Sequence, residues 1–120
     1  MRNILTCAAA TAVALSLAAP AHAYGESAQY TLRVVDETTG ESSLAALECD
    51  PAGGTHPRAE EACEAIEEAG GSIAEVDSSG APCTMIYQPV TVTSTGYEEY
   101  EETFGNACVL DTTKGAVFDF

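Results

Sequence analysis

The stretch Cys83-Thr84-Met85-Ile86-Tyr87-Gln88-Pro89-Val90 is the segment around which the rest of the sequence is organised. It joins a cysteine, which can fix the segment covalently, to an unbranched apolar side chain at Met85 and a proline at position 89. Because proline favours extended geometry in the preceding residue and donates no backbone hydrogen bond, we expect Thr84–Gln88 to be an exposed edge rather than a central strand. An exposed edge with one large apolar side chain is typical of a substrate-like ligand for another protein.

Two segments nearer the N-terminus predict strands. Residues 29–35 alternate between two faces, with Tyr30, Leu32 and Val34 on one of them, which is the period of a strand. Residues 42–49 follow a run of turn formers and are interpreted as the antiparallel partner of the first strand, although their apolar residues also fit one face of a helix.

The next segment predicts a helix that starts near Pro57 and ends at Gly70. Proline is favoured at the first helical position, and either Thr55 or His56 can serve as the N-cap. Small and apolar residues then recur at helical spacing, opposite a face rich in glutamate: Ala59, Ala62, Cys63, Ile66 and Ala69. The loop that follows, at residues 71–82, has room for one helical turn around Ile73–Val76.

Further strands are predicted beyond the opening stretch. Val90–Thr93 is β-branched throughout, residues 94–96 form a turn, and Tyr97–Phe104 pairs back to complete a hairpin. A short strand at residues 116–120 would place three side chains on one face: Ala116, Phe118 and Phe120. Five strands, one main helix and at most a short second helix predict an α+β sandwich, in which helix covers one face of a five-stranded antiparallel sheet.

The N-terminal 23 residues have the features of a cleaved signal peptide. A short positive start precedes an uncharged run from Ile4 to Ala19, and Ala21-His22-Ala23 is a typical cleavage motif. The run is too short to span a bilayer. We therefore expect residues 1–23 to be removed and residues 24–120 to form one secreted, extracellular domain.

Charge and cysteine content limit the partners of this domain. It contains 19 acidic residues against Arg33, Arg58 and Lys114, a formal charge of −16. Nucleic acid and membrane surfaces are therefore excluded as partners, because both attract basic patches. Four cysteines remain after loss of Cys7, and an even number in a small exported domain predicts two disulfides, with three possible pairings.

Several motifs, taken in order, resemble the Streptomyces subtilisin inhibitor family. They are Cys49-Asp-Pro-Ala-Gly-Gly-Thr-His-Pro57, Ala62-Cys63, Cys83-Thr-Met-Ile-Tyr87-Gln-Pro-Val-Thr-Val92, Phe104-Gly-Asn106-Ala-Cys108 and Val117-Phe118-Asp-Phe120. Together they cover nearly all of residues 24–120. The sequence departs from the usual family pattern at Tyr97, where tryptophan is common, and at Thr84, where many members have proline.

The resemblance implies a standard-mechanism inhibitor of serine proteases, which is a homodimer and not an enzyme. It implies the pairings Cys49–Cys63 and Cys83–Cys108. It places the reactive bond at Met85–Ile86, with Cys83, Thr84 and Tyr87 in the same inhibitory loop. An unbranched Met85 side chain suits the apolar pocket of a subtilisin-like or chymotrypsin-like protease better than the acidic pocket of a trypsin-like one.

Some of these residues also fit other interpretations. Met85 and Ile86 would be core residues if their segment were an ordinary strand. His56 would ligate a metal with Cys49 and Cys63 only if those cysteines were unpaired, so no metal and no cofactor are expected. The glutamates at 98–102 lack the spacing of a calcium loop. The alternative function is a small acidic secreted domain that binds another partner, or has a structural role, without inhibiting a protease.

Overall fold

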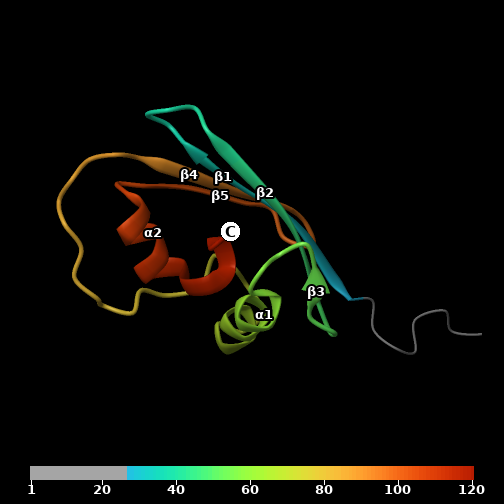
Figure 1. The fold of residues 1–120 in the computed structure, drawn as a ribbon. Coiled ribbons are helices and arrows are strands. Elements are labelled where there is room, and N and C mark those ends of the chain that lie inside the picture. Colours follow the sequence, from blue (N-terminus) through green and yellow to red (C-terminus); the bar gives the residue numbers. More distant parts are fainter. Residues whose placement is uncertain (1–26) are drawn as a thin grey trace, which may run out of the picture.

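The computed structural model describes residues 27–120, so the predicted signal peptide at residues 1–23 lies outside the described part of the chain. The strands form one antiparallel sheet in the order β3-β2-β1-β4-β5 (Figure 1). Their bounds are β1 Ala28–Asp36, β2 Ser42–Cys49, β3 Gly53–Gly54, β4 Val90–Gly96 and β5 Tyr100–Phe104. Within residues 27–120, no helix is long and apolar enough to cross a membrane.

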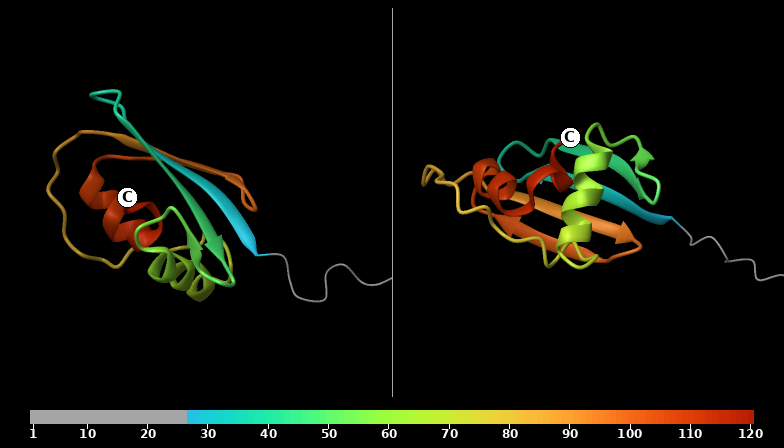
Figure 2. Two further views of the ribbon diagram at one scale, coloured as in Figure 1. Left: turned by 45° about the vertical axis from the view of Figure 1, so that its right-hand side comes forward. Right: turned by 90° about the horizontal axis from the view of Figure 1, so that it is seen from below.

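Helices cover one face of this sheet. They are α1 Ala59–Glu68, α2 Ala107–Lys114 and the 3-10 helix η1 Gly115–Phe118, and all lie on the same side of the strands (Figure 2). The single-domain α+β architecture predicted from the sequence, a five-stranded sheet with helix on one face, is confirmed.

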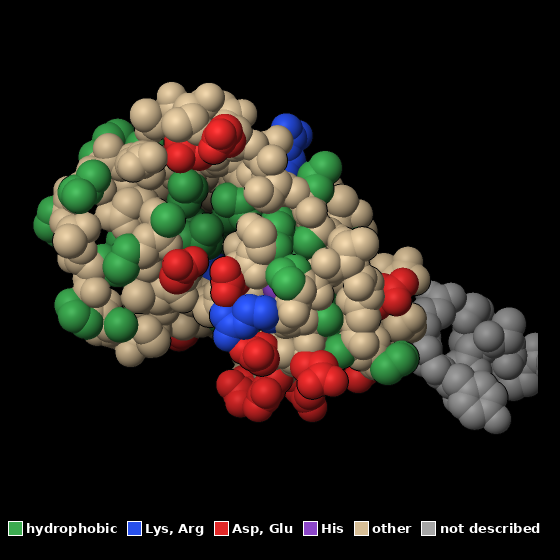
Figure 3. Space-filling view, in the orientation of Figure 1, with side chains coloured by type: hydrophobic (Ala, Val, Ile, Leu, Met, Phe, Trp, Pro, Cys, Tyr) green, Lys and Arg blue, Asp and Glu red, His purple; other side chains and the backbone are tan. Residues whose placement is uncertain are grey.

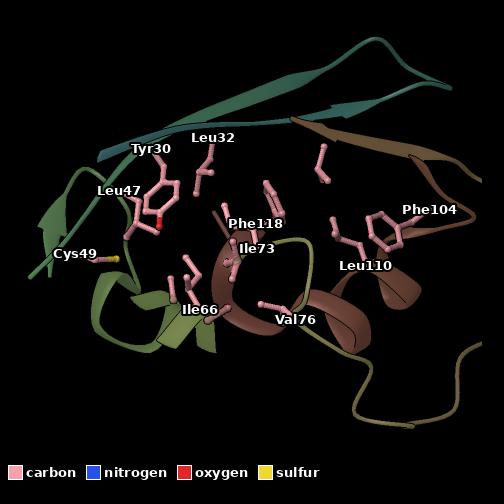
Figure 4. Packing of buried hydrophobic residues seen from close by; sticks show 14 of the residues in the cluster. Tyr30, Leu32, Leu47, Cys49, Ile66, Ile73, Val76, Phe104, Leu110 and Phe118 are labelled. Carbon is pink, nitrogen blue, oxygen red and sulfur yellow. The ribbon is translucent and has the colours of Figure 1, made fainter. Parts of the chain in front are cut away.

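The core lies between the sheet and the helices (Figure 4). Alternation along the strands turns Leu32, Leu47 and Val92 inward, where they are fully buried, and Ile73 and Val117 meet them from the opposite layer. Each such side chain stabilises the fold by about 1.5–3 kcal/mol relative to its exposed state. Within the described part of the chain, no helix lies on the opposite face of the sheet (Figure 2).

The main helix begins later than predicted and uses another N-cap. The cap residue of α1 is Arg58, which makes no side-chain cap hydrogen bond. The two predicted cap residues are engaged elsewhere: Thr55 Oγ1 accepts a hydrogen bond from Ala46 N at 2.8 Å, and the His56 ring bonds Arg58 N and Val117 O at 2.9 Å each. These contacts fix the segment before the helix to β2 and to η1.

The C-terminal strand prediction was wrong. Residues 116–118 belong to η1, and all three side chains are buried, which a strand with alternating faces would not allow. The fifth strand of the sheet is instead the two-residue β3, within the glycine- and proline-containing stretch between Cys49 and Pro57. The helix α2 was not predicted, because Val109, Thr112 and Thr113 are poor helix formers.

The β4–β5 hairpin also turns later than predicted. Strand β4 continues to Gly96, and β5 begins only at Tyr100, which pairs with Ser94. Ser94 Oγ donates a 2.8 Å hydrogen bond to Glu98 O and so closes the turn. Gly96 has φ +100°, and a Cβ there would lie 2.6 Å from Gln29 O, so only glycine fits this close approach to β1.

A buried lysine and a glutamate hold the segment Ser72–Val76 from two sides. Lys114 Nζ donates to the carbonyl oxygens of Ile73, Ala74 and Val76 at 3.0, 3.1 and 2.9 Å. The Glu98 carboxylate accepts hydrogen bonds from the backbone N–H groups of Ile73 and Ala74 at 2.6 and 3.0 Å. Lys114 is buried, so these carbonyls take the place of water around its charge. The predicted helical turn at Ile73–Val76 is present as a single turn.

Candidate functional site

The loop between Ile73–Val76 and β4 carries three consecutive apolar side chains in solvent. Met85 is 97% exposed, Ile86 65% and Tyr87 81%, in a fold that buries most of its other large apolar residues. The loop curves out at one end of the molecule beyond α2 (Figure 1), and hydrophobic side chains line this end of the surface (Figure 3). Exposed apolar groups that lie together mark an interaction site. The interpretation of Met85 and Ile86 as core residues is therefore wrong.

The N-terminal side of this loop is fixed by a disulfide. Cys83 is bonded to Cys108 in the first turn of α2. The other disulfide joins Cys49 at the end of β2 to Cys63 in α1, away from the loop. These are the two pairings that the family resemblance implies. The Cys83–Cys108 disulfide fixes the loop to the helical layer, and the Cys49–Cys63 disulfide fixes α1 to the sheet.

Asn106 supports the loop from beneath. Its Nδ2 donates to Thr84 O at 3.0 Å and to Ile86 O at 2.9 Å, the carbonyl groups on either side of Met85. Its Oδ1 accepts a 2.8 Å hydrogen bond from Val109 N and thereby caps α2. The side chain is buried, so water competes little for these bonds. One amide thus ties the backbone around Met85 to a helix.

The C-terminal side of the loop is held by β1 and by the end of β5. Gln88 N donates to Gly105 O at 2.8 Å, and Glu37 N donates to Pro89 O at 3.0 Å. The Gln88 side chain donates to Asp36 Oδ2 at 3.1 Å. The predicted edge at Thr84–Gln88 is thus exposed, but it is a loop beside the sheet and not one of its strands.

Hydrogen bonds also set the charge state of Asp36. The backbone N–H groups of Thr39 and Thr38, and then the Gln88 amide, hold the pKa of Asp36 below its usual value. Donors that point at a carboxylate favour its ionised form. Asp36 therefore remains an anion, and an acceptor for Gln88, over the neutral and mildly acidic range.

The structure brings together five of the predicted site residues in one loop: Cys83, Thr84, Met85, Ile86 and Tyr87. Among residues 27–120, no group of three His, Cys, Asp or Glu side chains is placed to hold a metal ion. His56 accepts from Arg58 N at Nδ1 and donates from Nε2 to Val117 O, so both ring nitrogens have structural partners.

The role of Asn106 was not predicted from the sequence. Asparagine before a helix is a common N-cap, and that signal was available had α2 been recognised. The contacts of its Nδ2 with Thr84 and Ile86 have no local sequence signal, because residues about 20 positions apart meet only in the folded chain.

The arrangement can bind another protein, because its backbone is held in place while the side chains of Met85, Ile86 and Tyr87 remain exposed. Such a segment can lie along a partner's cleft as an added strand, so that its backbone groups provide affinity and its side chains provide specificity. Prior fixation reduces the conformational entropy lost on binding, which is on the order of 1 kcal/mol for each residue ordered.

Comparison with known proteins identifies relatives along most of the chain. The sequence model of the subtilisin inhibitor-like family matches residues 9–106. A subtilase-type protease inhibitor of Streptomyces fradiae is 39% identical, over 96% of this chain and 92% of that protein. Subtilisin inhibitor-like protein 1 of Streptomyces cacaoi is 37% identical, over 72% of this chain and 93% of that protein.

A solved structure is similar as well. Sermetstatin of Streptomyces caespitosus, in its crystal structure with subtilisin of Bacillus licheniformis, is 26% identical with a TM-score of 0.62. The similarity covers 79% of this chain and all of sermetstatin. With its fold, its pair of disulfides and these relatives, the chain belongs to the subtilisin inhibitor-like family.

Proposed function

We propose that the protein is a secreted inhibitor of subtilisin-like serine proteases, not an enzyme, and that it presents the Met85–Ile86 peptide bond to its target. The observation that carries the proposal is the pair of hydrogen bonds from Asn106 Nδ2 to Thr84 O and Ile86 O, beneath a Met85 side chain that is 97% exposed. A backbone held on both sides of one exposed side chain suits a ligand that binds like a substrate and reacts slowly.

The proposed mechanism uses the catalytic groups of the protease. Its serine attacks the Met85 carbonyl carbon, the bond to Ile86 nitrogen breaks, and the protease histidine supplies the proton to the new amine. The acyl half stays fixed through Cys83–Cys108, and the amine half through the Ile86 O and Gln88 N contacts. The amine therefore stays beside the acyl carbon and can attack it again, which restores the peptide bond.

Met85 is the proposed specificity residue. Its unbranched thioether side chain enters an apolar pocket without leaving a polar group unpaired. A trypsin-like pocket contains a carboxylate, and methionine offers that group no cation. We therefore propose subtilisin-like targets first and chymotrypsin-like targets second.

Homodimer formation is part of the proposal, through the face of the sheet that carries no helix. This face presents Leu44, which is 67% exposed, beside Arg33 of β1 and near Thr93 of β4. Two such faces can pack at about 10 Å, as sheets do in β-sandwiches.

Because each subunit is strongly acidic, the affinity of the two subunits for each other should rise as salt screens their repulsion. Leu44→Glu should give a monomer in sedimentation experiments, and an unchanged dimer would contradict this surface.

Export is supported by the N-terminal sequence. The positive start, the apolar run and the motif Ala21-His22-Ala23 are the three parts of a signal peptide. We propose that residues 1–23 are removed and that residues 24–120 form the extracellular protein. Two disulfides in a small domain suit an oxidising compartment.

Titration of subtilisin with the protein tests the proposal. We expect stoichiometric loss of activity and, on long incubation, scission only between Met85 and Ile86. Met85→Lys should gain inhibition of trypsin, whereas Met85→Leu, which keeps an apolar side chain, should still inhibit subtilisin. Rapid digestion at many sites, with no inhibition, would favour the alternative function of an acidic domain with another partner.

A further inference from the structure

The inhibitory loop alone is too small to form a stable complex. A standard protein–protein interface uses about 20–30 residues from each partner. The loop segment 83–89 has seven residues. This inference rests on the proposed function: if the loop binds a protease, other segments at the same end of the molecule must contact that protease as well.

The turn between β1 and β2, residues 36–41, is attached to this loop. Glu37 N donates to Pro89 O at 3.0 Å, and Asp36 Oδ2 accepts from the Gln88 side chain at 3.1 Å. Both contacts lie three or four residues after the Met85–Ile86 bond, on the side of the leaving amine. The turn and the loop project from the same end of the sheet (Figures 1 and 2).

The same turn is internally fixed. Asp36 Oδ1 accepts hydrogen bonds from Thr38 N at 2.8 Å and Thr39 N at 3.1 Å, while Gly40 N donates to Asp36 O at 2.7 Å. Asp36 N donates to Glu41 O at 2.8 Å and closes the turn. A segment ordered before binding adds contact area at little further cost in entropy.

We propose that the β1–β2 turn is a second contact segment for the protease, on the leaving-amine side of the Met85–Ile86 bond. The exposed side chains there include Glu37 and Glu41, while the loop from Ser78 to Pro89 carries no charged residue. The two glutamates add exposed negative charge to that of Asp36 next to the neutral loop. The turn therefore favours proteases with basic side chains on that rim of the cleft over proteases with acidic ones.

A double-mutant cycle tests this inference. One axis is Glu37→Gln with Glu41→Gln in the inhibitor. The other is a pair of subtilisin variants with either lysine or glutamate at one surface position on the leaving-amine side of the cleft. The matched control is Glu60→Gln with Glu64→Gln, which removes the same charge from exposed positions on α1, separated from the loop by α2 (Figure 1).

The wild-type inhibitor should associate about tenfold faster with the lysine variant than with the glutamate variant at low salt, and high salt should remove this difference. The Glu37/Glu41 change should abolish most of the preference, and the Glu60/Glu64 change should leave it intact. Equal effects of the two changes, or no effect of either, would overturn the contact. If wild-type protein failed to inhibit any subtilisin, the proposed function itself would fall, which is a different result.

Discussion

The Nδ2 atom of Asn106 lies 2.9 Å from the carbonyl oxygen of Ile86, and the same atom lies 3.0 Å from the carbonyl oxygen of Thr84. A buried side chain on a helix cap is therefore bonded to both sides of the most exposed apolar residue of the loop. This relationship connects the stability of α2 to the geometry around Met85.

Asn106→Ala should impair both the helix and the loop. Loss of the cap and of the bonds to the loop should destabilise the fold by about 1–3 kcal/mol in denaturant unfolding. Cleavage of Met85–Ile86 by subtilisin should become faster, because the new chain ends are less well held.

Asn106→Asp separates these two roles. Aspartate keeps an oxygen that can accept from Val109 N, but it loses the amide that donates to the loop. We expect the cap of α2 to be kept and loop cleavage to become faster, with some loss of stability because a buried carboxylate then faces the carbonyl oxygens of Thr84 and Ile86. Slow cleavage equal to that of the wild type would show that the loop does not depend on this amide.

The two disulfides offer a matched comparison. They close loops of 25 and 14 residues, so removal of either should cost a similar amount, about 2–4 kcal/mol. Replacing Cys83 and Cys108 by serine should also turn the inhibitor into a substrate of subtilisin. Replacing Cys49 and Cys63 by serine should lower the stability of the fold. Below its new melting temperature, this variant should still inhibit subtilisin as well as the wild type does. If both variants were digested alike under folded conditions, the specific role of Cys83–Cys108 would be refuted.

Acid should weaken the contact between Asp36 and Gln88. The pKa of Asp36 is lowered in the folded protein, so its ionised form adds stability that is complete above the usual aspartate value of 3.8. That contribution is lost as the pH falls through the lowered pKa. The difference in free energy of unfolding between wild type and Asp36→Asn should therefore be constant from about pH 5 to 7 and shrink below about pH 4.

Nuclear magnetic resonance can follow this titration directly through the side-chain amide of Gln88. Its signals should shift with the titration of Asp36 and stay still in Asp36→Asn. If the Gln88 amide signals of the wild type did not shift as Asp36 titrates, the contact between Asp36 and Gln88 would be excluded.

Lys114 should be essential to the fold. Lys114→Ala removes the donor that the carbonyl oxygens of Ile73, Ala74 and Val76 share, two of them on buried residues, which should destabilise the protein by at least about 3 kcal/mol. Arg33→Ala removes the same charge from an exposed strand position and should change the stability by less than about 0.5 kcal/mol in the monomer. Equal effects in urea unfolding would contradict the structural role of Lys114.

The sequence predicted the features that depend on local pattern. Alternation at Tyr30 and Leu32 located β1, and the glutamate-rich run with alanines located α1. It failed where tertiary contacts override local preference. Phe118 packs on Tyr100 from a 3-10 helix and not from a strand, and α2 forms from residues of modest helix propensity because Asn106 caps it and Leu110 is buried.

For the candidate site, the sequence located the loop but not its supports. Cysteine, methionine and proline at fixed spacing marked the segment around Met85, and the family resemblance supplied the disulfide pairing. The contacts from Asp36, Glu37 and Asn106 come from segments distant in sequence. Such contacts depend on the register of β1 against β4, which no single segment determines.

The most direct test of the central claim is the equilibrium at the Met85–Ile86 bond. Protein cleaved at this bond should be prepared, separated and incubated with a catalytic amount of subtilisin, in parallel with intact protein, and the two forms measured by mass spectrometry. We predict that both samples converge on the same mixture, because the protease rejoins the tethered ends. Cleaved protein that stays cleaved, while intact protein is consumed, would contradict the claim.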